Sequence, residues 1–127
     1  MAVLQTNELL KENLSRKTGL HRLTDEETEA IKNVVLEAAL DVIALCEENG
    51  IPYMLGGGSA LGAVRHGGFI PWDDDIDLNI PRKYITQLIH AIENRYPDKY
   101  YIEAPLYTEG YLSSFIQVHR RNTVFQE

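Results

Sequence analysis

The fold is decided by residues 55–81, which read LGGGSALGAVRHGGFIPWDDDIDLNIP. The composition of this stretch is uneven in two ways. Six of the chain's nine glycines lie between Gly56 and Gly68, and four of its seven aspartates lie between Asp73 and Asp77. A glycine-rich segment is therefore followed closely by an acidic one, and the other elements of the fold can be placed around this pair.

The acidic segment has the alternation of polar and apolar residues that is typical of a strand. In a strand over 75–80, Asp75 and Asp77 share one face, and Asp73 has the same parity if the extended backbone begins there. Two carboxylates ~4 Å apart repel by about 4 kcal/mol at an effective dielectric of 20, and a divalent cation between them reverses the sign. Mg²⁺ takes one or two carboxylates in addition to substrate phosphates. The segment therefore predicts a magnesium site, with a solvated acidic loop as the alternative.

The glycine segment lies between an expected strand at 53–55 and an expected helix at 59–66. Gly57 and Gly58 allow the backbone to approach a ligand closely, and the N–H groups and dipole of a following helix favour an anion there. Ser59 can cap the helix or donate to a phosphate. The pattern predicts a phosphate-binding turn, with a plain tight turn as the alternative.

Three common motifs are excluded by spacing. No lysine follows the glycines, so the segment is not a Walker A loop, and Gly62 comes one place too late for the dinucleotide fingerprint G-x-G-x-x-G. Counted from Asp73, an EF-hand loop requires glycine at its sixth position and glutamate at its twelfth. This chain has Leu78 and Tyr84 at those positions.

Together the two segments indicate phosphoryl or nucleotidyl transfer, in which the protein mainly positions groups and neutralises charge. Arg65 is the only formal positive charge between Gly50 and Asp73, and it is a candidate to bind a phosphate oxygen. An ion pair with an aspartate is its alternative role. Arg82, just after the acidic strand, is a second phosphate-binding candidate, with exposed surface charge as its alternative.

Periodicity predicts the remaining elements. Thr24 and Glu27 form a capping box for a helix over 25–49 with one apolar face, and Gly50 ends it. Pro81 opens a further helix. Leu61 and Val64, in the helix at 59–66, are expected to face the core, and further strands are expected at 100–103, at 112–119 and from 124. The order predicts an α+β fold (α/β-like), with a small mixed β-sheet packed by helices.

The composition fits one globular domain: the chain has 127 residues, 44% of them hydrophobic and 24% charged, with a net charge of −7. This negative balance argues against non-specific binding of nucleic acid, which requires a basic footprint. No apolar run approaches the ~20 residues that cross a bilayer, and the N-terminus lacks the apolar region of a signal peptide. The single cysteine, Cys46, favours a reducing, cytoplasmic setting. We expect residues 1–23 to be a weakly structured segment or a short helix, and residues 24–127 to be the core.

Residues 55–77 closely resemble the signature of the LicD family, which comprises phosphocholine transferases of bacterial surface glycans and is related to the fukutin-type transferases. The resemblance implies a nucleotidyltransferase-like fold, with a turn after the first core strand at Gly57, Gly58 and Ser59. It also implies that paired metal ligands follow that turn in an acidic run. In this sequence these ligands are Asp75 and Asp77, with Asp73 as a third acidic member.

The resemblance further implies a reaction. Phosphocholine would pass from CDP-choline, a nucleotide-linked donor, to a sugar hydroxyl of a glycan acceptor such as lipopolysaccharide or teichoic acid. The implied cofactor is Mg²⁺, with Mn²⁺ as a substitute. Family members commonly have Lys and Arg where this chain has Gln117 and His119. They are also longer and complete the site with an acid on a later strand, for which Glu103 is one candidate. The chain is therefore expected to be the N-terminal part of a longer one.

Two other functions stay open at this point. The first is a non-catalytic or truncated module that binds a nucleotide or a metal without turnover. The second is a transferase of the same fold that uses another nucleotide-linked donor, such as a polyol or sugar phosphate. The sequence does not select the head group.

Overall fold

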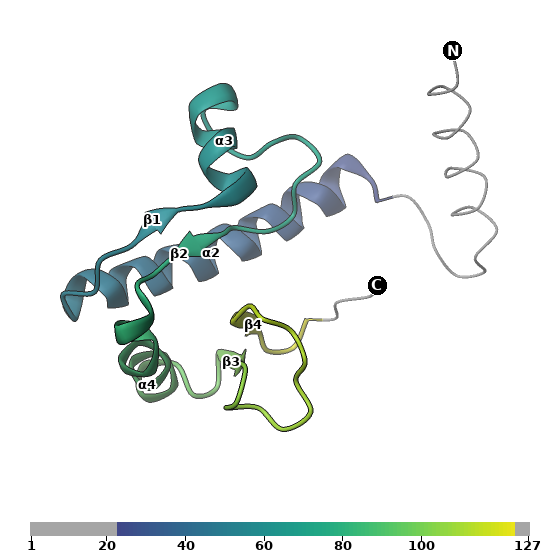
Figure 1. The fold of residues 1–127 in the computed structure, drawn as a ribbon. Coiled ribbons are helices and arrows are strands. Elements are labelled where there is room, and N and C mark those ends of the chain that lie inside the picture. Colours follow the sequence, from purple (N-terminus) through teal and green to yellow (C-terminus); the bar gives the residue numbers. More distant parts are fainter. Residues whose placement is uncertain (1–22, 124–127) are drawn as a thin grey trace, which may run out of the picture.

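The computed structural model describes residues 23–123 (Figure 1). Its elements are, in chain order, α2 (Asp25–Glu48), β1 (Met54–Leu55), α3 (Gly57–His66), β2 (Leu78–Asn79), the 3₁₀ helix η1 (Arg82–Tyr84), α4 (Ile85–Arg95), β3 (Tyr100–Glu103) and β4 (Gln117–Arg120). The predicted α+β class is confirmed. The expected N-terminal segment, apart from its last residue, and the strand expected from 124 lie outside the described residues.

The long helix α2 organises the other elements, with α3 on one side of it and α4 with the β3–β4 hairpin on the other (Figure 1). The predicted capping box is present: the Thr24 hydroxyl accepts from the Glu27 N–H (3.1 Å), and the Glu27 carboxylate accepts from the Thr24 N–H (2.8 Å). Gly50 follows the helix with φ +64°, as a helix stop requires. Within residues 23–123, no helix has the length and apolar character to cross a membrane.

The hydrophobic core lies where α2, α4 and β3 meet. Cys46, on the apolar face of α2, is fully buried there. The other buried members of this cluster are Val42, Leu45, Ile51, Leu88, Ile92 and Tyr100.

The strands form two separate antiparallel pairs. Met54 pairs with Asn79 and Leu55 with Leu78 in one sheet, whereas β3 pairs with β4 in the other. The single mixed sheet that the sequence predicts is therefore divided in two in the described part of the chain. The first pair stays short because α3 already begins at Gly57, so that β1 offers only two residues.

Several predicted details differ from the structure. The apolar run at 53–55 is a strand only over its last two residues, and both are exposed. Leu61 and Val64 are also exposed (49% and 90%), because α3 packs through the buried Gly62 instead. The strand expected at 112–119 begins only at Gln117. In the first two cases apolar character was taken to indicate burial, but these residues are exposed. The limits of the third strand follow its pairing with β3.

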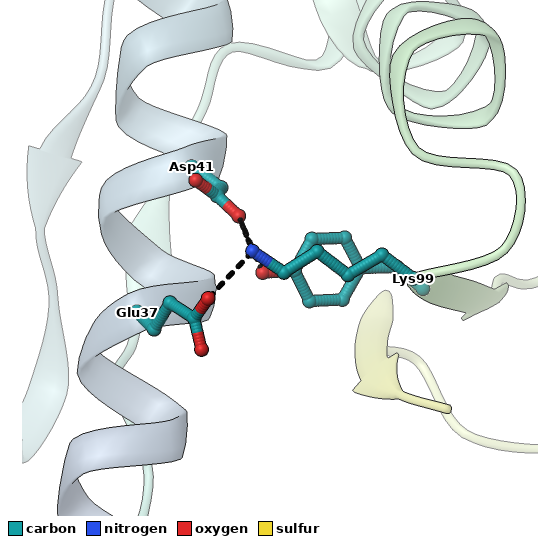
Figure 2. Close-up of polar contacts among 4 residues, drawn as sticks. Glu37, Asp41 and Lys99 are labelled. Carbon is teal, nitrogen blue, oxygen red and sulfur yellow. Dashed lines mark hydrogen bonds and ion pairs between the residues drawn. The ribbon is translucent and has the colours of Figure 1, made fainter. Parts of the chain in front are cut away.

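A polar junction joins α2 to β3 (Figure 2). The Lys99 ammonium lies 2.6 Å from the Asp41 carboxylate and 2.7 Å from that of Glu37. The Tyr100 hydroxyl donates to the same Asp41 oxygen at 2.6 Å. Burial alone would raise the pKa of Asp41, but the hydrogen bonds from Lys99 and Tyr100 and the Lys99 charge outweigh it and lower the pKa below its ordinary value. The junction therefore holds Asp41 in its charged form.

Candidate active site

The β1–β2 pair brings the acidic segment onto the glycine segment. The Gly56 N–H donates to the Asp77 carbonyl oxygen at 2.9 Å. The Asp77 N–H in turn donates to the Ser59 hydroxyl at 2.8 Å. The backbone of Asp77 is thus bonded through both its polar groups to the segment that starts α3.

The carboxylates of this acidic segment lie against glycines. A Cβ at Gly57 would collide with the Asp77 carboxylate, and a Cβ at Gly58 would lie 2.6 Å from an oxygen of the Asp73 carboxylate. Gly57 also has φ +44°, a conformation that L side chains rarely adopt. The two carboxylates can therefore lie over the start of α3 because Gly57 and Gly58 have no side chains.

The start of α3 differs from the prediction in a way that matters for the site. The helix begins at Gly57 and not at Ser59, so both glycines are in its first turn. The N-cap, Gly56, has no side chain to bond the first N–H groups. These groups and the helix dipole favour negative charge. The first turn can therefore stabilise the neighbouring carboxylates or a phosphate brought to them.

The exposed and buried residues of the acidic segment alternate as predicted. Asp75 and Asp77 are exposed, whereas Ile76 and Leu78 are half-buried, and Asp73 is half-buried as well. Regular strand pairing covers only Leu78 and Asn79, so the rest of the segment lies outside the strand. The parity argument therefore holds for the side chains, although the strand is shorter than 75–80.

The electrostatics of the segment favour a bound cation or proton. Although Asp75 is exposed to solvent, the surrounding protein removes part of the water around its carboxylate, and this desolvation, followed by the charges of Asp77, Asp73 and Asp74, raises its pKa. Among residues 23–123, no three His, Cys, Asp or Glu side chains are gathered as a ready metal cage. Mg²⁺ requires only one or two carboxylates when substrate phosphates supply further oxygens. The donor set therefore fits a magnesium ion that is shared with a phosphorylated substrate.

The two predicted phosphate-binding residues, Arg65 and Arg82, are not held against the aspartate carboxylates as the glycines are. Arg65 is in the last turn of α3, about 12 Å along the helix axis from Gly57. It is exposed, and its Nε lies 3.4 Å from His66 Nδ1. Arg82 is exposed in η1, two residues after Ile80. Their contact with a phosphate stays a prediction.

Glu103 has a partner in the other sheet. Its carboxylate lies 3.0 Å from His119 Nε2, and the His119 ring stacks on Tyr101 at 4.6 Å between centroids. Both residues belong to the β3–β4 pair, whereas the aspartates adjoin β1–β2. In the described part of the chain, Glu103 therefore pairs with a histidine and does not complete the aspartate group.

Asn79 was not selected from the sequence as a site residue. Its amide nitrogen lies 2.7 Å from the position that a Cβ at Gly56 would occupy. The signal was present, because Asn79 has the parity of Asp75 and Asp77 in the alternating segment. It therefore borders the same glycine turn as the carboxylates.

Comparison with known proteins identifies the family. Residues 50–125 match the family model described as LicD/FKTN/FKRP, nucleotidyltransferase domain, which is more than half of the chain. The chain therefore belongs to this family. No solved structure matches the chain significantly.

Three relatives show how the similarity is distributed. The lipopolysaccharide cholinephosphotransferase LicD of Haemophilus influenzae is 64% identical over 39 residues, which are 31% of this chain and 15% of the relative. The human ribitol 5-phosphate transferase FKRP is 54% identical over 44 residues, 35% of this chain and 9% of the relative. An uncharacterised protein of Rickettsia prowazekii is 50% identical over 56 residues, 42% and 21% respectively. The matched part of the chain thus spans less than a quarter of each relative, and the two relatives with described functions are transferases of phosphate-bearing groups.

Proposed function

We propose that this chain carries the catalytic site of a Mg²⁺-dependent transferase. It would move a phosphocholine-type group from a nucleotide-linked donor, CDP-choline, to a sugar hydroxyl of a surface glycan. The observation that supports this most directly is the seating of the Asp73 and Asp77 carboxylates against Gly58 and Gly57. The N-terminus of α3 stabilises these carboxylates, but they still repel one another, and a divalent cation bound between them would turn that repulsion into attraction.

Each residue has a role in this proposal. Asp75 and Asp77 hold Mg²⁺, which when bound neutralises charge on the transferred phosphate. The first turn of α3 offers its N–H groups to the donor phosphates. Ser59 fixes the Asp77 backbone through its oxygen and keeps its own proton to donate to a phosphate.

The proposed reaction is a displacement at the choline-bearing phosphorus of the donor. The acceptor hydroxyl oxygen bonds to the choline-bearing phosphorus, the bridge to the second phosphorus breaks, and CMP leaves. Asp73 or Asp77 accepts the proton of the hydroxyl. The positioning of these groups supplies most of the catalysis in such a reaction.

A second donor class is favoured by a specific observation. The human relative is named for ribitol 5-phosphate and the bacterial one for cholinephosphate, and both match short stretches of this chain. A nucleotide-linked polyol phosphate is therefore the alternative donor. A module that binds the nucleotide without turnover is the non-catalytic alternative.

Calorimetry tests the site. We expect CDP-choline to bind in the presence of Mg²⁺, and Asp75→Asn/Asp77→Asn to abolish that binding. Asp98→Asn, which replaces one carboxylate at an exposed turn, should leave it intact. Unchanged binding in the double variant would remove the proposal. CDP-ribitol in the same titration decides the donor class, and release of CMP with a sugar acceptor separates an enzyme from a binding module.

A further inference from the structure

The loop that leads from α3 to the acidic segment is fixed at its start by close packing. Gly67, with φ +67°, ends α3 and donates to the Gly62 carbonyl oxygen. A Cβ at Gly62 would lie 2.5 Å from the Gly68 carbonyl oxygen and 3.1 Å from the Ile70 nitrogen. Ile70 itself is only 6% exposed. The first half of the loop is therefore held by backbone contact with α3 and by burial of one side chain.

The second half of the loop is a tight turn with a weaker hold. The Asp73 N–H donates to the Ile70 carbonyl oxygen at 2.9 Å, which closes a four-residue turn around Pro71 and Trp72. Trp72 is 77% exposed, so its side chain does not anchor the turn by burial. Within residues 23–123, the side chain that bonds to the turn from outside is that of Lys32 on α2, whose ammonium donates to the Pro71 carbonyl oxygen at 3.0 Å across 39 residues of sequence.

We propose that Lys32 is a positioning residue for the acidic site: it holds the turn at residues 70–73 against α2 and thereby sets the Asp73 carboxylate over Gly58. Its described contacts are a carbonyl oxygen and the Phe69 ring, 5.8 Å from Nζ, so it acts on the loop and not on a carboxylate. The placement of Asp73 matters only if Asp73 takes part in the acidic site, so the inference rests on the proposed function.

The charge of Lys32 and its hold on the turn have opposite effects on the affinity of the acidic segment for a cation. An ammonium near the acidic segment repels a divalent cation, so removal of the charge alone strengthens cation binding. Release of the turn moves the Asp73 charge away from Asp75 and Asp77, the proposed cation ligands, and so weakens that binding. The direction of the change in Lys32→Met therefore distinguishes positioning from a purely electrostatic role.

Trp72 makes the turn directly observable because it is the chain's only tryptophan. In the metal-free 127-residue chain, we expect Lys32→Met to lower the residual fluorescence anisotropy of Trp72. Quenching of the same fluorescence by Mn²⁺ then gives the cation affinity, which we expect to fall about tenfold, as for other residues that orient metal ligands.

Two variants complete the experiment. Lys83→Met removes the same charge from an exposed lysine of η1 and should leave the Trp72 anisotropy unchanged. Lys32→Arg keeps the charge and the donors, and a hollow of about 310 Å³ lined by Lys32, Phe69 and Leu36 leaves room for the larger head group. We expect Lys32→Arg to restore most of both signals.

The outcomes separate the two proposals. Unchanged Trp72 anisotropy in Lys32→Met, or Mn²⁺ binding as tight as in the wild type, overturns the positioning role of Lys32. If the wild-type chain binds no Mn²⁺ while Lys32→Met still loosens Trp72, the proposed metal-dependent function fails and the hold on the turn stands. A similar loosening in Lys83→Met would assign the effect to net charge and would also overturn the inference.

Discussion

At the scale of single residues, the site depends on the absence of side chains as much as on their presence. Gly57 and Gly58 are needed for different reasons: Gly57 combines a positive φ with contact to Asp77, whereas Gly58 gives space to Asp73 alone. The atom that a Cβ at Gly58 would meet is the end of a side chain that can rotate away. A methyl group there should therefore disturb the site more than the fold.

We predict that Gly58→Ala leaves the melting temperature close to that of the wild type but weakens Mn²⁺ binding about tenfold, because Asp73 must leave its place. Gly68→Ala is the matched control, since its Cβ would meet nothing within 4 Å. Thermal unfolding and a Mn²⁺ titration measure the two quantities. Equal Mn²⁺ affinities in the two variants would show that the Asp73 position does not matter for a cation.

At the scale of elements, the α2–β3 junction joins parts of the chain that are 58 residues apart (Figure 2). Asp41 accepts from both Lys99 and Tyr100 and has a side chain only 23% exposed, whereas Glu37, which is 52% exposed, has Lys99 as its partner within the described residues. Hydrogen bonds to a buried charge contribute more than an exposed ion pair. The Asp41 carboxylate should therefore contribute more to the free energy of unfolding than the Glu37 carboxylate.

We predict that Asp41→Asn lowers the free energy of unfolding by about 2 kcal/mol. Glu37→Gln, the same change at the exposed partner, should cost less than about 1 kcal/mol. Urea unfolding with a shared slope measures both. Equal losses in the two variants would contradict the assignment of Asp41 as the centre of the junction.

At the scale of the whole molecule, the same junction limits stability at both ends of the pH range. The pKa of Asp41 is lowered below 3.8, so its contribution is present above that value and is lost as the pH falls through the lowered pKa. Burial and the hydrogen bond to Asp41 raise the pKa of Tyr100 from 10.0 to about 12. Hydrogen bonds to Asp41 and Glu37 also raise the pKa of Lys99. Both groups stabilise the fold below their ordinary pKa and lose that contribution as the pH rises.

We predict a plateau of stability between about pH 4 and pH 9, with a fall on either side. The alkaline fall begins there because burial raises the pKa of Cys46 above 9.0, an effect common to the proteins compared. Asp41→Asn should flatten the acid limb, and Tyr100→Phe should flatten the part of the alkaline limb between pH 10 and 12. Asp75 has the opposite effect to Asp41, because its pKa is raised. This effect is present in the wild type, in Asp41→Asn and in Tyr100→Phe, so it cancels when they are compared. Melting temperature as a function of pH measures the limbs, and an unchanged acid limb in Asp41→Asn would contradict the role of Asp41.

The elements whose signals are local were predicted well. The capping box and the start of α2 at Asp25 are confirmed, as is the strand Tyr100–Glu103, because caps and short-range periodicity act within a few residues. The second strand of that hairpin was predicted five residues too early, since its true limits depend on pairing with β3. The predicted buried face of α3 was also wrong. Leu61 and Val64 were expected to be buried because they are apolar, but the buried residue of this helix is Gly62.

By itself, the sequence determined the α+β class, the capped long helix, the glycine turn and the spacing of the aspartates, since each depends on residues that are neighbours along the chain. Only the tertiary structure decided which carboxylate lies over which glycine, that Glu103 pairs with His119, and that Lys32 holds the Pro71 carbonyl. These contacts join residues 15 or more positions apart, and no local period specifies them. They arise from the antiparallel pairing of β1 with β2, the pairing of β3 with β4 and the packing of a loop on α2, which are properties of the folded chain.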